Sequence, residues 1–585
     1  MFANKLLYKG FVIGFGACIV SPFIYAERFD PAVDGLIRNQ QRQEELEKII
    51  QPSSDVKLEV EQKASNIKFS DIQEDPCFEI QNVQLVGDLV PKFERYLKQA
   101  LKDMEFRSGM CIGEKGINAL MTRTQNYIID RGYTTTRIVA SPQNLKSGTL
   151  QLTVIPGLVN EIQIDLSNAD ETHADRIQYA KNIFPVKKGD VLNLRAIEQG
   201  LENLKRLPTV DADIQIAPTS EANISNIHVK WIQRKIPVRL TLSVDDSGSP
   251  QTGKYQGSAT ISIDNPLFRS DLFYFTYGRD LAHKSKITDQ FGKTVDSGTD
   301  NYAMHYSIPY KNWLISANAS QYQYDQAVAG ATSVYNYNGE SKTQDIGLTR
   351  LLYRDAKRKT TTTLKGWHRE SKSYIDDAEI TVQRRDVAGW QLNVDHREYI
   401  GSSTLDVGLG YKRGTGALDA IRAPEELFDE GTSRMKIWNL DVNFNIPFKA
   451  YQQNLTYTTA LRAQYNDTPL TSQDRISIGG RYTVRGFDGD MTLMGDRGFY
   501  LRNDLAWSYL PAHQLYLGVD GGRVGGQSAE DLVGKSLIGS AVGLRGQFML
   551  GGQLYYDIFA GAPIQKPKGF QTDDTTYGFS LSYSF

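Results

Sequence analysis

The sequence has little of several features that would indicate a nucleic-acid-binding protein, a metalloenzyme or a helical membrane protein. Its 66 basic and 68 acidic residues nearly cancel, so no charge excess points to nucleic acid. The seven histidines are scattered without metal-ligand spacing, and no HExxH, Gly-x-Ser-x-Gly or complete phosphate-loop motif occurs. No apolar run reaches the roughly 18 residues that a membrane helix needs. We therefore expect no catalytic residues, no cofactor, no metal and no nucleic-acid partner.

Cysteine is also scarce, with only Cys18, Cys77 and Cys111. Two early lysines, an apolar run over 11–20 and a change to charged residues after position 26 are typical of a secretory signal peptide, residues 1–26. Cys18 would be removed with it; the alternative, a lipoprotein acceptor, fits poorly because the apolar run continues past this residue. In an exported chain we expect Cys77 and Cys111 to form a disulfide.

The sequence is rich in glycine and aromatic residues, with 50 Gly, 31 Tyr and 24 Phe, and beyond position 236 its hydrophobicity alternates with a period of two. In the last segment one face carries only aromatic and aliphatic residues: Tyr577, Phe579, Leu581, Tyr583 and Phe585. The other face is small and polar, which would leave unfilled space in a soluble sheet but suits a barrel with an aqueous lumen. The sequence thus predicts a transmembrane β-barrel over 236–585.

Sixteen strand-like segments can be counted from Pro237 to the end of the chain. An even number leaves the first and the last strand of the barrel both with their chain ends in the periplasm. Short turns alternate with long segments at 324–342, 414–433 and 465–497, as periplasmic turns alternate with external loops. A lumen of sixteen strands is wide enough for an aqueous path. We therefore expect something to fill or gate it.

A polar helix is predicted near the amino terminus. Asp30 is a good cap, Pro31 suits the first turn, and the segment to Ile50, which includes Arg38, is too polar for lipid or for a core. We assign 27–51 to a helix that plugs the lumen; a solvated helix without a role is the alternative. Residues 52–76 are predicted to be a flexible linker.

Between the linker and the barrel the order strand, helix, helix, strand, strand occurs twice, over 77–157 and 158–235. This order resembles the POTRA module, a periplasmic fold that offers a sheet edge and a groove to extended peptides. The predicted fold class is a membrane β-barrel combined with α+β modules.

The longest connection, an external loop over 466–497, contains the tetrapeptide Val484-Arg485-Gly486-Phe487. Together with sixteen strands, two POTRA-like modules and an aromatic carboxyl terminus, this tetrapeptide resembles the signature of the outer-membrane assembly-factor superfamily. In that superfamily the sixth external loop folds back into the lumen. The resemblance therefore implies that 466–497 folds inward.

Strand phasing turns Asp520 toward the lumen, and its surroundings match the second motif of the superfamily. The resemblance implies an Arg485–Asp520 ion pair that locks the loop, with Gly486 allowing close approach to the wall. The alternative lumenal partners are Arg502, Asp504, Arg545 and Asp557. In a wet lumen such a pair would contribute only about 0–1 kcal/mol unless it is dried.

The count of two modules, the polar helix and Arg-Gly-Tyr-Thr-Thr-Thr-Arg at 131–137 make the chain similar to two-partner secretion transporters. These receive one dedicated partner unfolded in the periplasm and pass it through the barrel. The resemblance implies a monomer in the bacterial outer membrane, in contact with its lipids, with a growth-inhibition toxin, adhesin or haemolysin as cargo. It also implies that the barrel assembly machinery reads the terminus with Tyr583 and Phe585. The alternatives are an assembly insertase, a passive porin or receptor, and a barrel hydrolase whose triad has no sequence motif.

Overall fold

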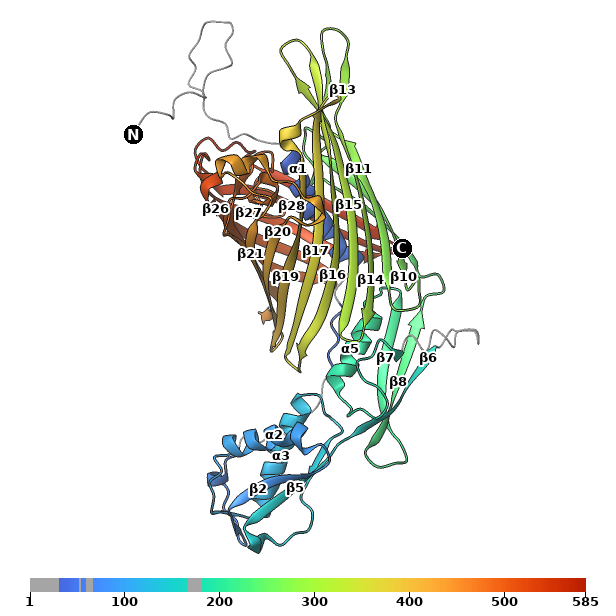
Figure 1. Cartoon of the computed structure of the whole chain (residues 1–585), viewed down its shortest axis with the longest axis vertical. Helices are drawn as coiled ribbons and strands as arrows, with labels where there is room; N and C mark the ends of the chain where they lie inside the picture. Colours follow the sequence, from blue (N-terminus) through green and yellow to red (C-terminus); the bar gives the residue numbers. More distant parts are fainter. Residues whose placement is uncertain (1–30, 52–53, 59–66, 167–180) are drawn as a thin grey trace, which may run out of the picture.

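The structure is a computed structural model that describes residues 31–51, 54–58, 67–166 and 181–585. The predicted signal peptide and Asp30 lie outside these residues, as does part of the first helix expected in the module over 158–235. Two small α+β modules follow one another below a β-barrel, and the helix α1 (Pro31–Ile50) lies inside the barrel (Figure 1).

The barrel closes through sixteen long antiparallel strands, which confirms the predicted fold class, and the two-residue strand β18 (Ala378–Glu379) is added at the end of one of them. The long strands are β9 (Val238–Asp245), β10 (Tyr255–Asp264), β11 (Leu272–Ala282), β14 (Gly298–Tyr310), β15 (Trp313–Ala329), β16 (Val334–Arg354), β17 (Arg358–Ile375), β19 (Arg385–Ile400), β20 (Ser403–Thr415), β21 (Lys436–Ala450), β22 (Gln453–Asn466), β25 (Arg497–Leu510), β26 (His513–Gly525), β27 (Ser536–Met549), β28 (Gln553–Gln565) and β29 (Thr576–Ser584). Closure occurs where Ser580–Ser584 pairs with Asp245–Thr241.

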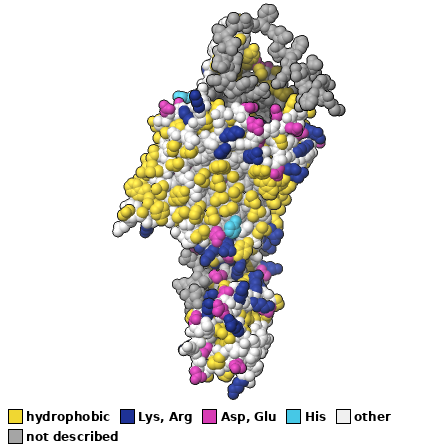
Figure 2. Space-filling model, turned by 90° about the vertical axis from the view of Figure 1, so that its left-hand side faces the viewer, with side chains coloured by type: hydrophobic (Ala, Val, Ile, Leu, Met, Phe, Trp, Pro, Cys, Tyr) yellow, Lys and Arg dark blue, Asp and Glu magenta, His cyan; other side chains and the backbone are white. Residues whose placement is uncertain are grey.

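Alternation along each strand separates a lipid-facing side from a lumenal side. On β26, Leu517 and Val519 are 59% and 52% exposed, whereas the alternating Tyr516 and Asp520 are buried. Figure 2 shows an apolar belt on the barrel, with charged side chains gathered above and below it. Separately, no helix in the described part of the chain combines the length and hydrophobicity needed to cross a bilayer.

One predicted loop is instead a hairpin. Strands β15 and β16 continue to Ala329 and Val334, so the connection expected over 324–342 is reduced to 330–333. The extra length extends above the rest of the barrel wall (Figure 1), where backbone pairing continues without lipid. A small cluster with Val295 of the hairpin β12 (Lys286–Thr288) and β13 (Thr294–Asp296) stabilises it.

The first module comprises β1 (Phe78–Ile80), β2 (Asn82–Gly87), α2 (Val90–Asp103), β3 (Met110–Ile112), α3 (Glu114–Asp130), β4 (Arg137–Val139) and β5 (Thr149–Ile155). It begins earlier than the boundary expected at Cys77. Phe69 packs in its core, and the Glu74 carboxylate accepts backbone N–H groups at the start of α3, at 2.6 Å from Gly113. The end of the predicted linker is therefore part of the module.

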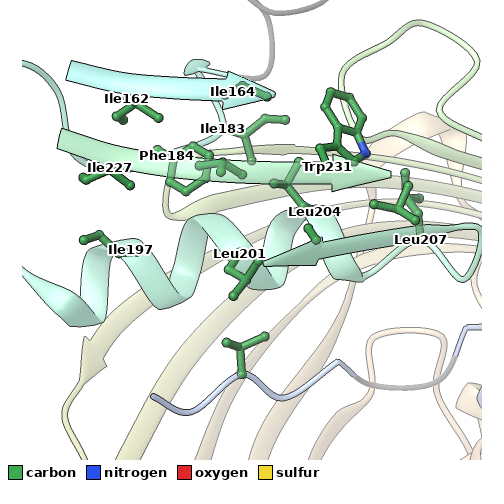
Figure 3. Packing of buried hydrophobic residues seen from close by; sticks show 14 of the residues in the cluster. Ile162, Ile164, Ile183, Phe184, Ile197, Leu201, Leu204, Leu207, Ile227 and Trp231 are labelled. Atoms are coloured by element: carbon green, nitrogen blue, oxygen red, sulfur yellow. The ribbon is translucent and has the colours of Figure 1, made fainter. Parts of the chain in front are cut away.

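The second module consists of β6 (Leu158–Leu166), α5 (Leu194–Lys205), β7 (Val210–Pro218) and β8 (Ile224–Gln233). Figure 3 shows α5 packed against its sheet, and Leu201 and Leu204 share one buried cluster with Phe184 and Trp231. Asn193 caps the helix by accepting the N–H groups of residues 195 and 196.

Gly200 gives a direct test of this packing. A Cβ added there would overlap the buried ring of Phe184. We expect Gly200→Val to destabilise the module by about 1–3 kcal/mol through overpacking. Hydrogen exchange of α5 and β8 in the full-length protein measures this. Gly366→Val, at a glycine of β17 with open space around it, is the control, and equal exchange in both variants would contradict the packing argument.

Candidate functional site: the plugged lumen

The lumen is occupied by α1, which is held to the wall by one buried ion pair. Arg42 Nε lies 2.8 Å from Asp245 Oδ2 on β9, and both side chains are nearly inaccessible. The other carboxylate oxygen accepts the N–H of Ser247 at 3.0 Å, and Arg42 Nη2 donates to Ser258 Oγ at 3.3 Å. Because all these groups are removed from bulk water, this pair positions the helix.

Further polar contacts join α1 to several sides of the wall. They are Gln43 with Asn301 at 3.2 Å, Glu47 with Tyr274 at 3.1 Å, and Glu44 with Arg462 at 3.3 Å. Their partners lie on β14, β11 and β22. The helix therefore crosses a polar lumen, and the predicted plug position agrees with these contacts.

The helix also binds the inward-folded loop. Arg38 Nε donates to Asp34 Oδ2 at 2.7 Å, and Arg38 Nη2 binds the carbonyl oxygen of Gly489. The other oxygen of Asp34 accepts the hydroxyl of Thr492 at 3.2 Å. Arg38, predicted only as a helix residue, thus connects the plug with the loop.

The loop between β22 and β25 lies in the lumen, and Arg485 is its central contact. Its Nε lies 2.6 Å from Asp520 Oδ2 and its Nη2 2.8 Å from Asp520 Oδ1. Nη2 also lies 2.5 Å from Asp504 Oδ1, one of the alternative partners. Asp520 further accepts the backbone N–H groups of Arg485 and Asn503. Strand register explains the shared site, because Asp504 faces Gly518, whose missing side chain makes room for the guanidinium.

This ion pair is dry. Asp520 is 1% exposed and Arg485 2%. The small contribution expected of a wet pair therefore does not apply, because breaking a buried pair costs about 3–5 kcal/mol. Sequence phasing placed Asp520 in the lumen but gave no sign that the loop would exclude water from it.

The two residues after Arg485 fit the loop against the wall. Gly486 has φ of +94°, and a Cβ there would lie 2.5 Å from the carbonyl oxygen of Ala562 on β28. Glycine is thus required both by backbone conformation and by contact. Phe487 is buried, with its ring centroid 5.6 Å from that of Phe570.

A second buried cluster on the loop was not predicted. Asp474 lies 2.8 Å from Arg369 of β17 and 2.9 Å from Lys412 of β20. These strands are on a different side of the barrel from β25 and β26, which hold Arg485. The loop is therefore bound to two separated parts of the wall, and no motif around Asp474 indicates this.

Part of the remaining space is at the periplasmic end of the lumen. A cavity of about 730 Å³ is lined by α1, by α5 and by the inner wall, including Asp395 of β19, Asp441 of β21 and Arg502 of β25. Among the residues that the structure describes, no group of three or more His, Cys, Asp or Glu is arranged to hold a metal ion.

Of the other predicted residues, the cysteines and the carboxyl-terminal aromatic residues lie away from the lumen, and Pro31 begins the lumenal helix. Cys77 and Cys111 are disulfide-bonded in the first module, with Cα atoms 5.3 Å apart. Phe585 exchanges backbone hydrogen bonds with Leu240 at the barrel closure, and the hydroxyl of Tyr583 donates to the carbonyl oxygen of Leu550. Pro31 is the first residue of α1.

Comparisons with known proteins agree with this architecture. A family model described as haemolysin secretion/activation protein ShlB/FhaC/HecB matches residues 223–546. POTRA models match 78–157, in the ShlB-type form, and 163–218.

Individual relatives extend the match over most of the chain. Outer membrane transporter CdiB-2 of Burkholderia pseudomallei is 34% identical over 528 residues, 88% of this chain and 87% of that protein. Outer membrane transporter CdiB of Dickeya dadantii is 27% identical over 96% of both chains. The solved structure of CdiB from Acinetobacter baumannii, 27% identical, superposes with a TM-score of 0.79 over 96% of this chain and all of the other. The chain therefore belongs to the ShlB/FhaC/HecB family of haemolysin secretion/activation proteins, the outer-membrane transporters of two-partner secretion.

Proposed function

We propose that the two POTRA modules receive a dedicated partner protein in an extended form and that the partner crosses the barrel after α1 leaves the lumen. The observation that carries this proposal is the position of α1. With the helix in place, cavities of the described lumen are lined by α1 itself, so an extended polypeptide requires its displacement. The contacts of α1 are largely polar and water can replace most of them.

Loop 466–497 stays bound in this proposal, because its dry ion pairs are costly to break, and it forms one wall of the path. Folding of the partner outside the cell supplies the driving force, and the protein itself has no enzymatic activity. A growth-inhibition toxin is the proposed cargo, which the similarity to transporters named CdiB supports. The barrel works as a monomer in contact with outer-membrane lipids, and the assembly machinery reads its terminus at Tyr583 and Phe585.

A covalent bridge between helix and wall tests the proposed displacement. Gln43 of α1 and Asn301 of β14 are in side-chain contact at 3.2 Å. We expect the double variant Gln43→Cys/Asn301→Cys, bridged with a short thiol-specific reagent, to export the product of the adjacent reading frame at least tenfold less than the unbridged protein. The single variants treated with the same reagent are the controls. Undiminished export by the bridged form would refute the displacement.

A further inference from the structure

The segment that follows α1, residues 54–58, is called the strap here. It runs between α5 of the second module and the periplasmic rim of the barrel. The Val56 side chain is buried in the core of the second module, together with Leu46 and Ile50 at the end of α1. In Figure 3 the blue segment of the chain passes beside α5. The plug is therefore attached to the second module through shared core residues.

The rim contributes one side chain to this junction, Arg354 at the end of β16. Its guanidinium binds the carbonyl oxygen of Val56 in the strap. It also binds Glu202, and lies 3.2 Å from Glu198 and 3.1 Å from Gln199, all on α5. With its side chain only 6% exposed, Arg354 thus contacts the barrel, the module and the strap at one place.

The strap is held from the opposite side by Glu198. Its Oε1 accepts the backbone N–H of Leu58 at 2.8 Å, and the same carboxylate is paired with Arg195 and Arg354. Burial raises the pKa of Glu198, which its N–H and arginine partners oppose. Arg354 therefore binds the carbonyl of Val56 and Glu198 binds the N–H of Leu58, and these two side chains also bind each other.

A second contact extends this junction along the rim. Asp55 binds the hydroxyl of Tyr399 and lies 3.4 Å from Arg397, both on β19. The α5 helix itself is docked through Arg206, whose Nη1 lies 2.8 Å from the carbonyl oxygen of Ser270. The second module and the strap thus lie against the same rim but through different residues, and Arg354 is shared by both.

We propose that Arg354 is a positioning residue that couples the docking of the second POTRA module to retention of the plug. A displacement of α5 from the rim removes the carboxylates that hold Arg354, and Arg354 then no longer holds the strap. Movement of the module during partner binding is thereby transmitted to α1. This inference rests on the proposed displacement of the plug. It adds the contact that determines when the plug is released.

The test uses the full-length transporter without partner and the same cysteine pair, Gln43→Cys/Asn301→Cys. We expect Arg354→Ala to lower the yield of the plug–wall bridge at least threefold. Arg354→Lys, which keeps the charge but has one donor group in place of the fork, should restore part of it. Bridge yield is compared only in the folded fraction, which heat-modifiable electrophoretic migration separates. A merely structural defect would lower that fraction and leave the bridge yield within it unchanged.

Arg358→Ala is the matched control, because Arg358 lies in the same turn region of the rim and pairs with Glu398 of β19 rather than with α5 or the strap. Its bridge yield should equal that of the parent. An unchanged yield in Arg354→Ala, or an equal loss in Arg358→Ala, overturns the proposal. Export by the fully bridged parent would instead refute displacement of the plug. The bridge yields measured without partner would still decide whether Arg354 retains the plug in the lumen.

Discussion

Arg485→Ala is expected to release the inward-folded loop from the wall and to lower export by two orders of magnitude or more. Asp520 would be left charged in a buried site, at a cost of about 3–5 kcal/mol, and each 1.4 kcal/mol changes the docked population about tenfold. External protease should then cleave within 466–497, and secretion of the partner into the medium measures transport. Arg497→Ala, at an exposed arginine where the loop ends, is the control.

A paired substitution separates charge from shape at this site. Arg485→Gln/Asp520→Asn removes both charges and should retain more docked loop than either single change, because no isolated charge is buried. A charge swap should not restore docking, because Asp520 also accepts backbone N–H groups that an arginine cannot bind. Normal protection of the loop in Arg485→Ala would show that the pair does not hold it.

Arg42→Glu is expected to empty the lumen of α1. The substitution removes the guanidinium whose Nε lies 2.8 Å from Asp245 Oδ2. It places a second carboxylate beside Asp245, in a site that excludes water. Loss of this buried pair costs about 3–5 kcal/mol, which shifts helix occupancy by about two to three orders of magnitude. Single-channel recording in planar bilayers should show a large, persistent conductance.

The control for this change lies three residues away on the same helix. Glu45 pairs with Lys48 at 2.6 Å, and both side chains are exposed to the lumen. Glu45→Ala should leave the conductance near that of the parent, because exposed pairs contribute about 0–1 kcal/mol. A closed channel in Arg42→Glu would mean that the remaining contacts suffice to retain the helix.

Much of the fold could be predicted because lipid imposes a simple rule on each strand. The alternation that ends at Phe585 recurs in every membrane-crossing segment, so strand number and starts follow closely from sequence. The rule weakens where lipid ends. At β16 the loop expected over 324–342 contains nine residues of strand, 334–342, because above the belt lipid no longer imposes the alternation.

The contacts inside the lumen were less predictable. Inward side chains are polar on nearly every strand, so composition does not select partners, and the path of a long loop determines them. The Arg485–Asp520 pair was implied by a family resemblance, whereas Asp474 with Arg369, and Arg42 with Asp245, have no local signal. Arg354 ends β16, next to a short turn. The sequence of this turn indicates only a solvated periplasmic end of the barrel.

The long hairpin formed by β15 and β16 is also exposed to whatever approaches the bacterium from outside. At roughly 3.3 Å per residue, the 17 residues of β15 extend about 56 Å along the strand, which at a tilt of about 40° still exceeds the roughly 25 Å height of the lipid-facing band of such a barrel. The turn at 330–333 therefore stands well outside the membrane, ahead of the pore mouth. Antibodies and bacteriophages that approach from outside the cell would therefore meet this turn and the adjoining hairpin β12–β13 before the pore mouth.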